Sequence, residues 1–140
     1  QKYIWLSSSG KTAGISSGAP VCFYGDPDAE SVIITEGILK TYVTYCLLSD
    51  IGVSVIGVPG VNVLGGLKEL LKQHHHKIAY EAYDMDKLEN EYVASAAEKV
   101  QQIARVAGLQ STSLVWNTAY KGIDDWQLAL RREEAKEKVA

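Results

Sequence analysis

Three acidic residues follow apolar segments of the chain, at positions where their carboxylates could hold a metal ion. Glu36 closes the segment SVIITE, and Asp84 and Asp86 follow the segment IAYEAY. Asp is poorly suited to the interior of a strand, so the second segment is expected to stop there. In an extended chain, residues two positions apart point the same way. Asp84 and Asp86 would therefore converge while Met85 points elsewhere.

These carboxylates would form one site if the two apolar segments were neighbouring strands. Three carboxylates within a few ångströms repel one another unless a cation lies between them. Hard oxygen ligands suit Mg²⁺, or Mn²⁺ in its place, which leaves coordination positions open for phosphate oxygens. We therefore predict a metal site formed by Glu36, Asp84 and Asp86. Taken singly, each residue could instead be a helix cap or an ordinary loop residue.

Two lysines are candidates for phosphate contacts beside this site. Lys40 lies about one helical turn after Glu36, and Lys121 precedes two further acidic residues, Asp124 and Asp125. Each lysine could contact a phosphate near the metal or merely balance the local negative charge. We count Lys40 among the candidate catalytic residues and keep both alternatives open for each lysine.

The elements that would position these residues alternate along the chain. The predicted strands are rich in β-branched and apolar residues, as expected of strands buried on both faces. The alternation of strand and helix predicts an α/β fold of Rossmann-like type, with about four mostly parallel strands and helices on both faces. Strands are predicted at 31–36, 53–58, 77–84 and 112–116, and helices at 38–50, 63–76, 88–108 and 123–140.

Such a sheet would bring the candidate residues to one edge. The crossovers between parallel strands are almost always right-handed, and ligands bind beyond the carboxyl ends of the strands. Gly37 follows Glu36 and would let the backbone turn without a side chain that crowds the site. Gly57 and Gly60 occur around the end of the second predicted strand, and we expect them in a loop near the same site.

Composition limits the class of protein. The chain has 140 residues, of which 46% are hydrophobic and 22% charged, which suits one folded domain. No apolar stretch reaches the roughly 18 residues needed to span a membrane, so no membrane association is expected. Cys22 and Cys46 form no CxxC motif, and a reduced, cytoplasmic setting is the default expectation. The net charge of −3 argues against a surface built to bind DNA unaided.

The first part of the chain differs in character from the rest. Residues 1–30 are rich in Ser and Gly, with short apolar pieces, and we predict a small β and loop segment there. This segment would lead into one α/β domain over residues 31–140. The chain opens at Gln1 rather than Met, which is compatible with a fragment of a longer protein.

The segments VIITEGILK and IAYEAYDMD resemble the Toprim domain, which is shared by topoisomerases, bacterial replicative primases, and some nucleases and recombination proteins. The resemblance covers most of the chain and implies a Toprim fold. It implies that Glu36 acts as a general acid or base linked to the metal, and that Asp84 and Asp86 bind the metal. The pattern is closest to the primase-like Toprim domains of plasmid and phage replication proteins.

A later segment, YKGIDDWQLAL, resembles an acidic region of primases and implies that Asp124 and Asp125 are auxiliary acidic residues of the site. The chain also departs from the primase pattern. Residues 87–90 (KLEN) follow the aspartate pair where bacterial primases typically have a small Ala-Gly segment, and Lys40 stands where primases usually have Asp.

Three functions follow as alternatives from this resemblance. The first is Mg²⁺-dependent nucleotidyl transfer on nucleic acid, with nucleoside triphosphates and a single-stranded template, inside a longer primase-like protein. A helicase or zinc-binding domain could belong to the same protein, and the isolated domain is expected to be inactive. The second is a nuclease, in which water attacks the phosphodiester. The third is a scaffold module without catalysis.

Other motifs are predicted to be structural. The segment SSSGKT at 7–12 lacks the first glycine of a phosphate-binding P-loop. The histidines at 74–76 are predicted to be a solvated helix end, because three consecutive side chains on a helix cannot face one point. The cysteines are predicted to pack in the interior. The three tryptophans are likewise predicted to pack rather than to stack on bases; they are Trp5, Trp116 and Trp126.

Overall fold

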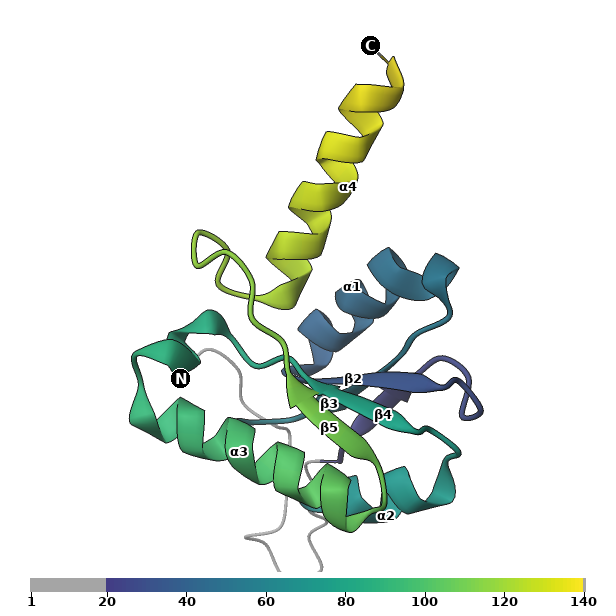
Figure 1. The fold of residues 1–140 in the computed structure, drawn as a ribbon, viewed down its shortest axis with the longest axis vertical. Coiled ribbons are helices and arrows are strands. Elements are labelled where there is room, and N and C mark those ends of the chain that lie inside the picture. Colours follow the sequence, from purple (N-terminus) through teal and green to yellow (C-terminus); the bar gives the residue numbers. More distant parts are fainter. Residues whose placement is uncertain (1–19, 140) are drawn as a thin grey trace, which may run out of the picture.

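One sheet of five strands forms the centre of the fold, with the order β1-β3-β2-β4-β5 (Figure 1). The computed structural model describes residues 20–139. Strands β2, β3, β4 and β5 run parallel, and β1 pairs with β3 in the antiparallel direction. The predicted α/β class with a mostly parallel sheet is confirmed. The strands are β1 (Cys22–Tyr24), β2 (Ser31–Glu36), β3 (Ser54–Val58), β4 (Ile78–Glu81) and β5 (Gln110–Ser113).

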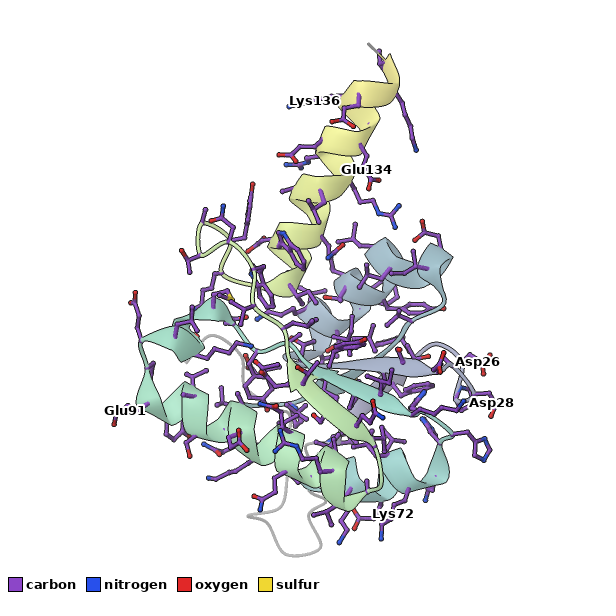
Figure 2. All side chains as sticks on the ribbon, viewed as in Figure 1. Asp26, Asp28, Lys72, Glu91, Glu134 and Lys136 are labelled. Atoms are coloured by element: carbon purple, nitrogen blue, oxygen red, sulfur yellow. The ribbon has the colours of Figure 1, made fainter. Side chains whose placement is uncertain are left out.

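Helices cover both faces of this sheet. Side chains of α2 and α3 pack on one face, and side chains of α1 and α4 pack on the other (Figure 1). The C-terminal part of α4, where Figure 2 labels Glu134 and Lys136, projects beyond the sheet. The elements are α1 (Ile38–Leu48), α2 (Leu67–Gln73), α3 (Glu91–Val106) and α4 (Ile123–Val139), with the 3-10 helices η1 (Ser49–Ile51) and η2 (Met85–Leu88).

Strand β2 lies at the middle of the sheet and is buried on both faces. Val32 and Ile34 belong to the core beneath α2 and α3, whereas Ile33 belongs to the core beneath α1 and α4. Alternate residues of a strand point to opposite faces, so an uninterrupted run of apolar residues places apolar side chains in the cores on both faces of the sheet. This burial fixes the position of Glu36 at the carboxyl end of the strand.

The last two strands differ in their bounds from the prediction. Strand β4 was predicted to reach Asp84 but ends at Glu81, and η2 begins at Met85. Strand β5 was predicted at 112–116 and lies at 110–113 instead. It is the edge strand of the described sheet, where it pairs with β4, and its polar residues are partly exposed. The apolar residues that follow leave the sheet, and Trp116 packs into the core beneath α1 and α4.

Helix α2 is shorter than the predicted span of 63–76. It begins only at Leu67, because Gly66 before it adopts the left-handed conformation, with a φ of 83°. It ends at Gln73, so the three histidines lie outside it. The prediction of a solvated helix end is wrong for His76, which is 6% exposed, whereas His75 is exposed.

Helices α3 and α4 lie close to their predicted spans. Helix α3 begins after Asn90, whose side-chain oxygen accepts hydrogen bonds from the backbone N–H groups of Tyr92 (3.0 Å) and Val93 (3.4 Å). This is a helix N-cap, and it starts the helix three residues later than the predicted position 88. Helix α4 starts at Ile123, as predicted.

Strand β1 joins residues from the predicted N-terminal segment to the sheet, through its pairing with β3. The segment at 7–12 and Trp5 lie outside the described residues, and the predicted boundary at residue 30 stays a prediction. Among residues 20–139, no helix has the length and apolar character required to span a membrane.

The packing predictions for Trp and Cys have mixed outcomes. Trp116 and Trp126 stack with their ring centroids 5.6 Å apart. Trp116 belongs to the core beneath α1 and α4 and Trp126 packs against it, which confirms their packing role. Cys22 is half-buried, and its sulfur lies 3.6 Å from the carbonyl oxygen of Gly57. Cys46 is exposed, so its predicted interior position is wrong.

Candidate active site

The carboxyl edge of the parallel strands holds most of the predicted site residues. Glu36, the last residue of β2, pairs in register with Val58, the last residue of β3. The backbone N–H of Gly37 donates to the carbonyl oxygen of Val58 at 2.9 Å, and Gly37 adopts a φ of 95°. Glycine suits this position because other residues rarely adopt a positive φ. The chain thereby turns directly from β2 into α1.

The two aspartates after β4 lie in a turn rather than in an extended segment. Asp84 immediately precedes η2, and Asp86 lies within it. The side chain of Met85 points into the protein, where its sulfur accepts a hydrogen bond from the backbone N–H of Trp116 at 3.5 Å. Met85 was predicted to point away from the two aspartates, and it does. The cause is the turn at η2, whereas the prediction assumed an extended strand.

Lys121 lies between the two aspartates. Its ammonium nitrogen is 3.9 Å from Asp84 Oδ2 and 3.4 Å from Asp86 Oδ2. The backbone carbonyl of the same lysine accepts a hydrogen bond from the N–H of Met85 at 2.9 Å. This segment before α4 is therefore attached to the aspartate turn by both its backbone and its side chain.

Lys40 forms the second cationic contact of Asp84. Its ammonium group pairs with Asp84 Oδ1, and the two side chains are 18% and 16% exposed. Lys40 thus reaches from the first turn of α1 to the turn after β4. Lys40 and Lys121, from different parts of the chain, together neutralise Asp84. This contact corresponds to the charge-balancing alternative that was considered for each lysine.

Asp124 lies beside the same group because Gly122 has no side chain. A Cβ atom at Gly122 would lie against Asp124 Oδ1, 3.3 Å from Lys40 Cε and 3.5 Å from Asp84 Oδ1. One buried carboxylate oxygen of Asp124 and one of Asp86 have no hydrogen-bond partner within the described residues. Buried carboxylate oxygens usually have partners, so these two could accept a ligand from outside the chain.

Burial also changes the protonation of Asp124. Desolvation raises the pKa of its carboxyl, the positive charge of Lys40 acts against this, and the negative charge of Asp125 adds to it. A carboxyl whose pKa is raised by folding binds its proton more tightly in the folded state. Stability attributable to Asp124 is therefore lost as the pH rises from the unfolded pKa through the folded pKa.

We therefore expect Asp124→Asn to raise the melting temperature at neutral pH by about 1–3 °C, because the asparagine carries no charge to desolvate. At about pH 3, where the carboxyl is protonated in both states, the variant and the unmodified protein should melt together. Thermal unfolding across the pH range measures this. A lower melting temperature for the variant at neutral pH would show that the Asp124 carboxylate stabilises the fold.

Glu36 is not grouped with these aspartates by any observed contact. It is half-buried. Burial of the Tyr83 hydroxyl raises the pKa of that group, and the negative charges of Glu36 and Glu81 raise it further. That hydroxyl donates to the backbone carbonyl of Val61 at 3.0 Å. Across residues 20–139, no three His, Cys, Asp or Glu side chains are placed to hold a metal ion together.

The remaining predicted residues have clear positions. Asp125 is exposed in the first turn of α4. Gly57 lies inside β3 rather than in a loop, and its missing side chain lets Thr41 of α1 pack against the strand. Gly60 lies in the turn after β3, where an added Cβ would come within 3.2 Å of Val63.

A buried ion pair beneath the aspartate turn was not predicted from the sequence. Lys87 Nζ donates to both carboxylate oxygens of Glu81, at 2.9 and 3.1 Å, and these side chains are 5% and 0% exposed. The same ammonium donates to Ser113 Oγ (2.9 Å) and to the carbonyl oxygen of Leu114 (2.7 Å). The N–H of Tyr83 donates to Glu81 Oε1 at 2.5 Å.

This ion pair connects β4, η2 and the end of β5. Glu81 belongs to β4, Lys87 belongs to η2 next to Asp86, and Ser113 belongs to β5. A charged residue within the apolar segment IAYEAY is the signal that could have revealed it, since a buried glutamate is almost always paired.

Two solved structures have a similar fold. The primase fragment of the bacteriophage T7 primase-helicase protein matches with a TM-score of 0.51 and 17% identity, over 81% of this chain and 44% of that chain. A chain from the T7 lagging-strand DNA polymerase complex with primase domains, an RNA/DNA hybrid and dTTP matches equally well, over 55% of its length. The chain therefore has a primase-like fold and spans about half the length of these relatives.

The sequence itself places the chain in a family. It belongs to the family described as a domain of unknown function, DUF3854, whose model matches residues 26–134. A comparison with curated proteins found no match.

Proposed function

We propose that this chain is the Toprim-type catalytic domain of a primase-like replication protein, which transfers nucleotides on nucleic acid with the aid of Mg²⁺ or Mn²⁺. One observation carries the proposal. Three aspartates and two lysines meet at the carboxyl edge of a parallel sheet in a primase-like fold, and two buried carboxylate oxygens have no hydrogen-bond partner among residues 20–139. Ligands bind at this edge of such sheets.

The donor set suits a hard cation that takes few protein ligands. Asp84 and Asp86 would hold it, with Asp124 or Glu36 completing the acidic surroundings, because Mg²⁺ binds one or two carboxylates and fills its other positions with water and phosphate oxygens. The bound metal would neutralise charge that develops on a triphosphate during transfer. Glu36 would act on a proton as general acid or base.

The two lysines would then change partners. While no metal is bound, Lys40 and Lys121 neutralise the aspartates. A cation at Asp84 would release the ammonium of Lys40 toward the phosphate groups of the incoming nucleotide. An ammonium group next to transferring phosphate stabilises the charge of the transition state.

Lys40→Met tests this exchange because it has opposite effects on binding and on activity. We expect the variant to bind Mn²⁺ about three- to tenfold more tightly, since the ion pair no longer competes. Nucleotide incorporation by the full-length protein should fall, since the phosphate contact is lost. Mn²⁺ titration followed by electron paramagnetic resonance and an incorporation assay measure the two effects. Lys77→Met, an exposed lysine outside the site, is the control. Weaker Mn²⁺ binding by Lys40→Met would contradict the exchange.

Partners follow from the same proposal. The T7 relatives include primase domains bound to an RNA/DNA hybrid and dTTP. By analogy, the full-length protein would bind a single-stranded template and nucleoside triphosphates, and a helicase or zinc-binding domain would share its chain. A net charge of −3 gives this domain little attraction for a template by itself. We therefore assign template binding mainly to other parts of the protein.

A scaffold without catalysis is the second candidate, and one observation favours it. Lys40 and Lys121 already neutralise Asp84, so the acidic cluster requires no metal for its stability. A nuclease would use the same residues with water in place of a nucleotide.

One assay separates these functions. The full-length protein is given a single-stranded template, labelled nucleoside triphosphates and Mg²⁺ or Mn²⁺, and both new and shortened strands are measured. Template-dependent incorporation supports the proposed function. Strand cleavage that needs no triphosphate shows the nuclease, and neither product together with no metal binding shows the scaffold.

A further inference from the structure

Two histidines converge at the opposite end of the sheet from the candidate active site. His74 and His76 lie between α2 and β4, where the chain is extended after the helix ends. Their facing ring nitrogens, His74 Nδ1 and His76 Nε2, are 3.3 Å apart. The side chain of His75, between them, points elsewhere and pairs with the exposed Asp28. Asp28 lies in the loop between β1 and β2, which Figure 2 shows at the margin of the molecule.

The loop between β1 and β2 holds this pair in place. His76 Nδ1 lies 2.6 Å from the backbone carbonyl of Ala29. A carbonyl oxygen can only accept, so the hydrogen of the neutral ring is on Nδ1 and the lone pair is on Nε2, which faces His74. The backbone N–H of His75 donates to the carbonyl of Pro27 at 2.9 Å and fixes the turn. Histidines that bind metals commonly have their other ring nitrogen held in this way.

The separation of the two nitrogens suits a shared metal ion. Zn²⁺ binds imidazole nitrogen at about 2.0–2.1 Å in tetrahedral geometry, so two such ligands lie about 3.3–3.4 Å apart. The observed 3.3 Å falls in this range. To bind the ion, His74 would carry its hydrogen on Nε2 instead of Nδ1, which changes no net charge.

We propose that His74 and His76 form a second metal site, which binds a divalent transition-metal ion of the Zn²⁺ class. Imidazole suits Zn²⁺, Cu²⁺ and Ni²⁺ rather than Mg²⁺, so this site and the aspartate site select different ions. Because residues 20–139 provide no third His, Cys, Asp or Glu ligand here, water completes the coordination. The ion would hold together the connection between α2 and β4, and the hydrogen bond of His76 to Ala29 would link it to the loop between β1 and β2. It would thereby stabilise that end of the sheet.

Calorimetric titration of tag-free protein with Zn²⁺ tests the site. Both Asp84 and Asp86 are replaced by Asn throughout, so that the aspartate site contributes little. His74→Gln should weaken Zn²⁺ binding by at least about tenfold, since even changes around a ligand commonly have that effect. His75→Gln is the matched control and should bind within about twofold of its parent. Equal loss in both variants, or no loss in His74→Gln, would overturn the proposal.

A second measurement detects the nitrogen ligands directly in the parent protein. Cu²⁺ bound to the same parent protein should show the splitting of two nitrogen ligands in its electron paramagnetic resonance spectrum, and His75→Gln should leave this unchanged. Saturating Zn²⁺ should also raise the melting temperature of the parent but not that of His74→Gln. A spectrum with a single nitrogen, or one that changes in His75→Gln, would mean that the 3.3 Å contact is only a hydrogen bond between two rings.

Discussion

Lys87→Met is expected to lower the free energy of unfolding by about 3–5 kcal/mol, because it leaves the buried carboxylate of Glu81 without its cation. The Glu81 side chain is fully buried, and Lys87 makes four hydrogen bonds that join two strands and the aspartate turn. Methionine has a similar length and no charge, so the loss reports the charge rather than the packing. Urea unfolding followed by circular dichroism measures it.

Two further variants show whether the ion pair is the cause. In the double variant Glu81→Gln with Lys87→Met, no charge remains buried, and most of the lost stability should return. Lys77→Met removes one partner of the exposed pair Lys77–Glu30, whose atoms are 3.8 Å apart, and should change stability by less than about 1 kcal/mol. A double variant as unstable as Lys87→Met would contradict this explanation.

Asp84→Asn is expected to reduce nucleotide incorporation by the full-length protein by about a hundredfold or more, as the loss of one preorganised electrostatic contact commonly does. Asp84 is the residue that both lysines contact, and under the proposed function its replacement would also remove a metal ligand. Mn²⁺ binding should weaken in parallel. Incorporation is measured with labelled triphosphates on a single-stranded template, at several Mn²⁺ concentrations.

The control for this prediction is Glu133→Gln, an exposed acidic residue on α4 that lies outside the site. It should leave both incorporation and Mn²⁺ binding unchanged. If high Mn²⁺ concentrations restore nucleotide incorporation by Asp84→Asn, the substitution acts by weakening metal binding. Full activity of Asp84→Asn at low Mn²⁺ would remove Asp84 from the catalytic machinery and favour a site elsewhere in the protein.

Local patterns in the sequence determined the fold class and the edge of the sheet where the candidate residues lie. The β-branched run at 31–36 is buried on both faces in the structure, because a central strand contacts helices on each side. The positions of Glu36 and the two aspartates followed from where their apolar segments stop. These features depend on a few neighbouring residues, so periodicity and residue type reveal them.

Only the tertiary structure decided which charges meet. Lys40 and Asp84 are 44 positions apart, and Glu81 and Ser113 are 32 apart. Their contacts depend on how α1, η2 and β5 pack on the sheet. Asp124 joins the cluster because Gly122 leaves room beside Lys40 and Asp84. Which distant side chains meet depends on how the helices and strands pack. The residue types at two separate positions carry little information about that packing.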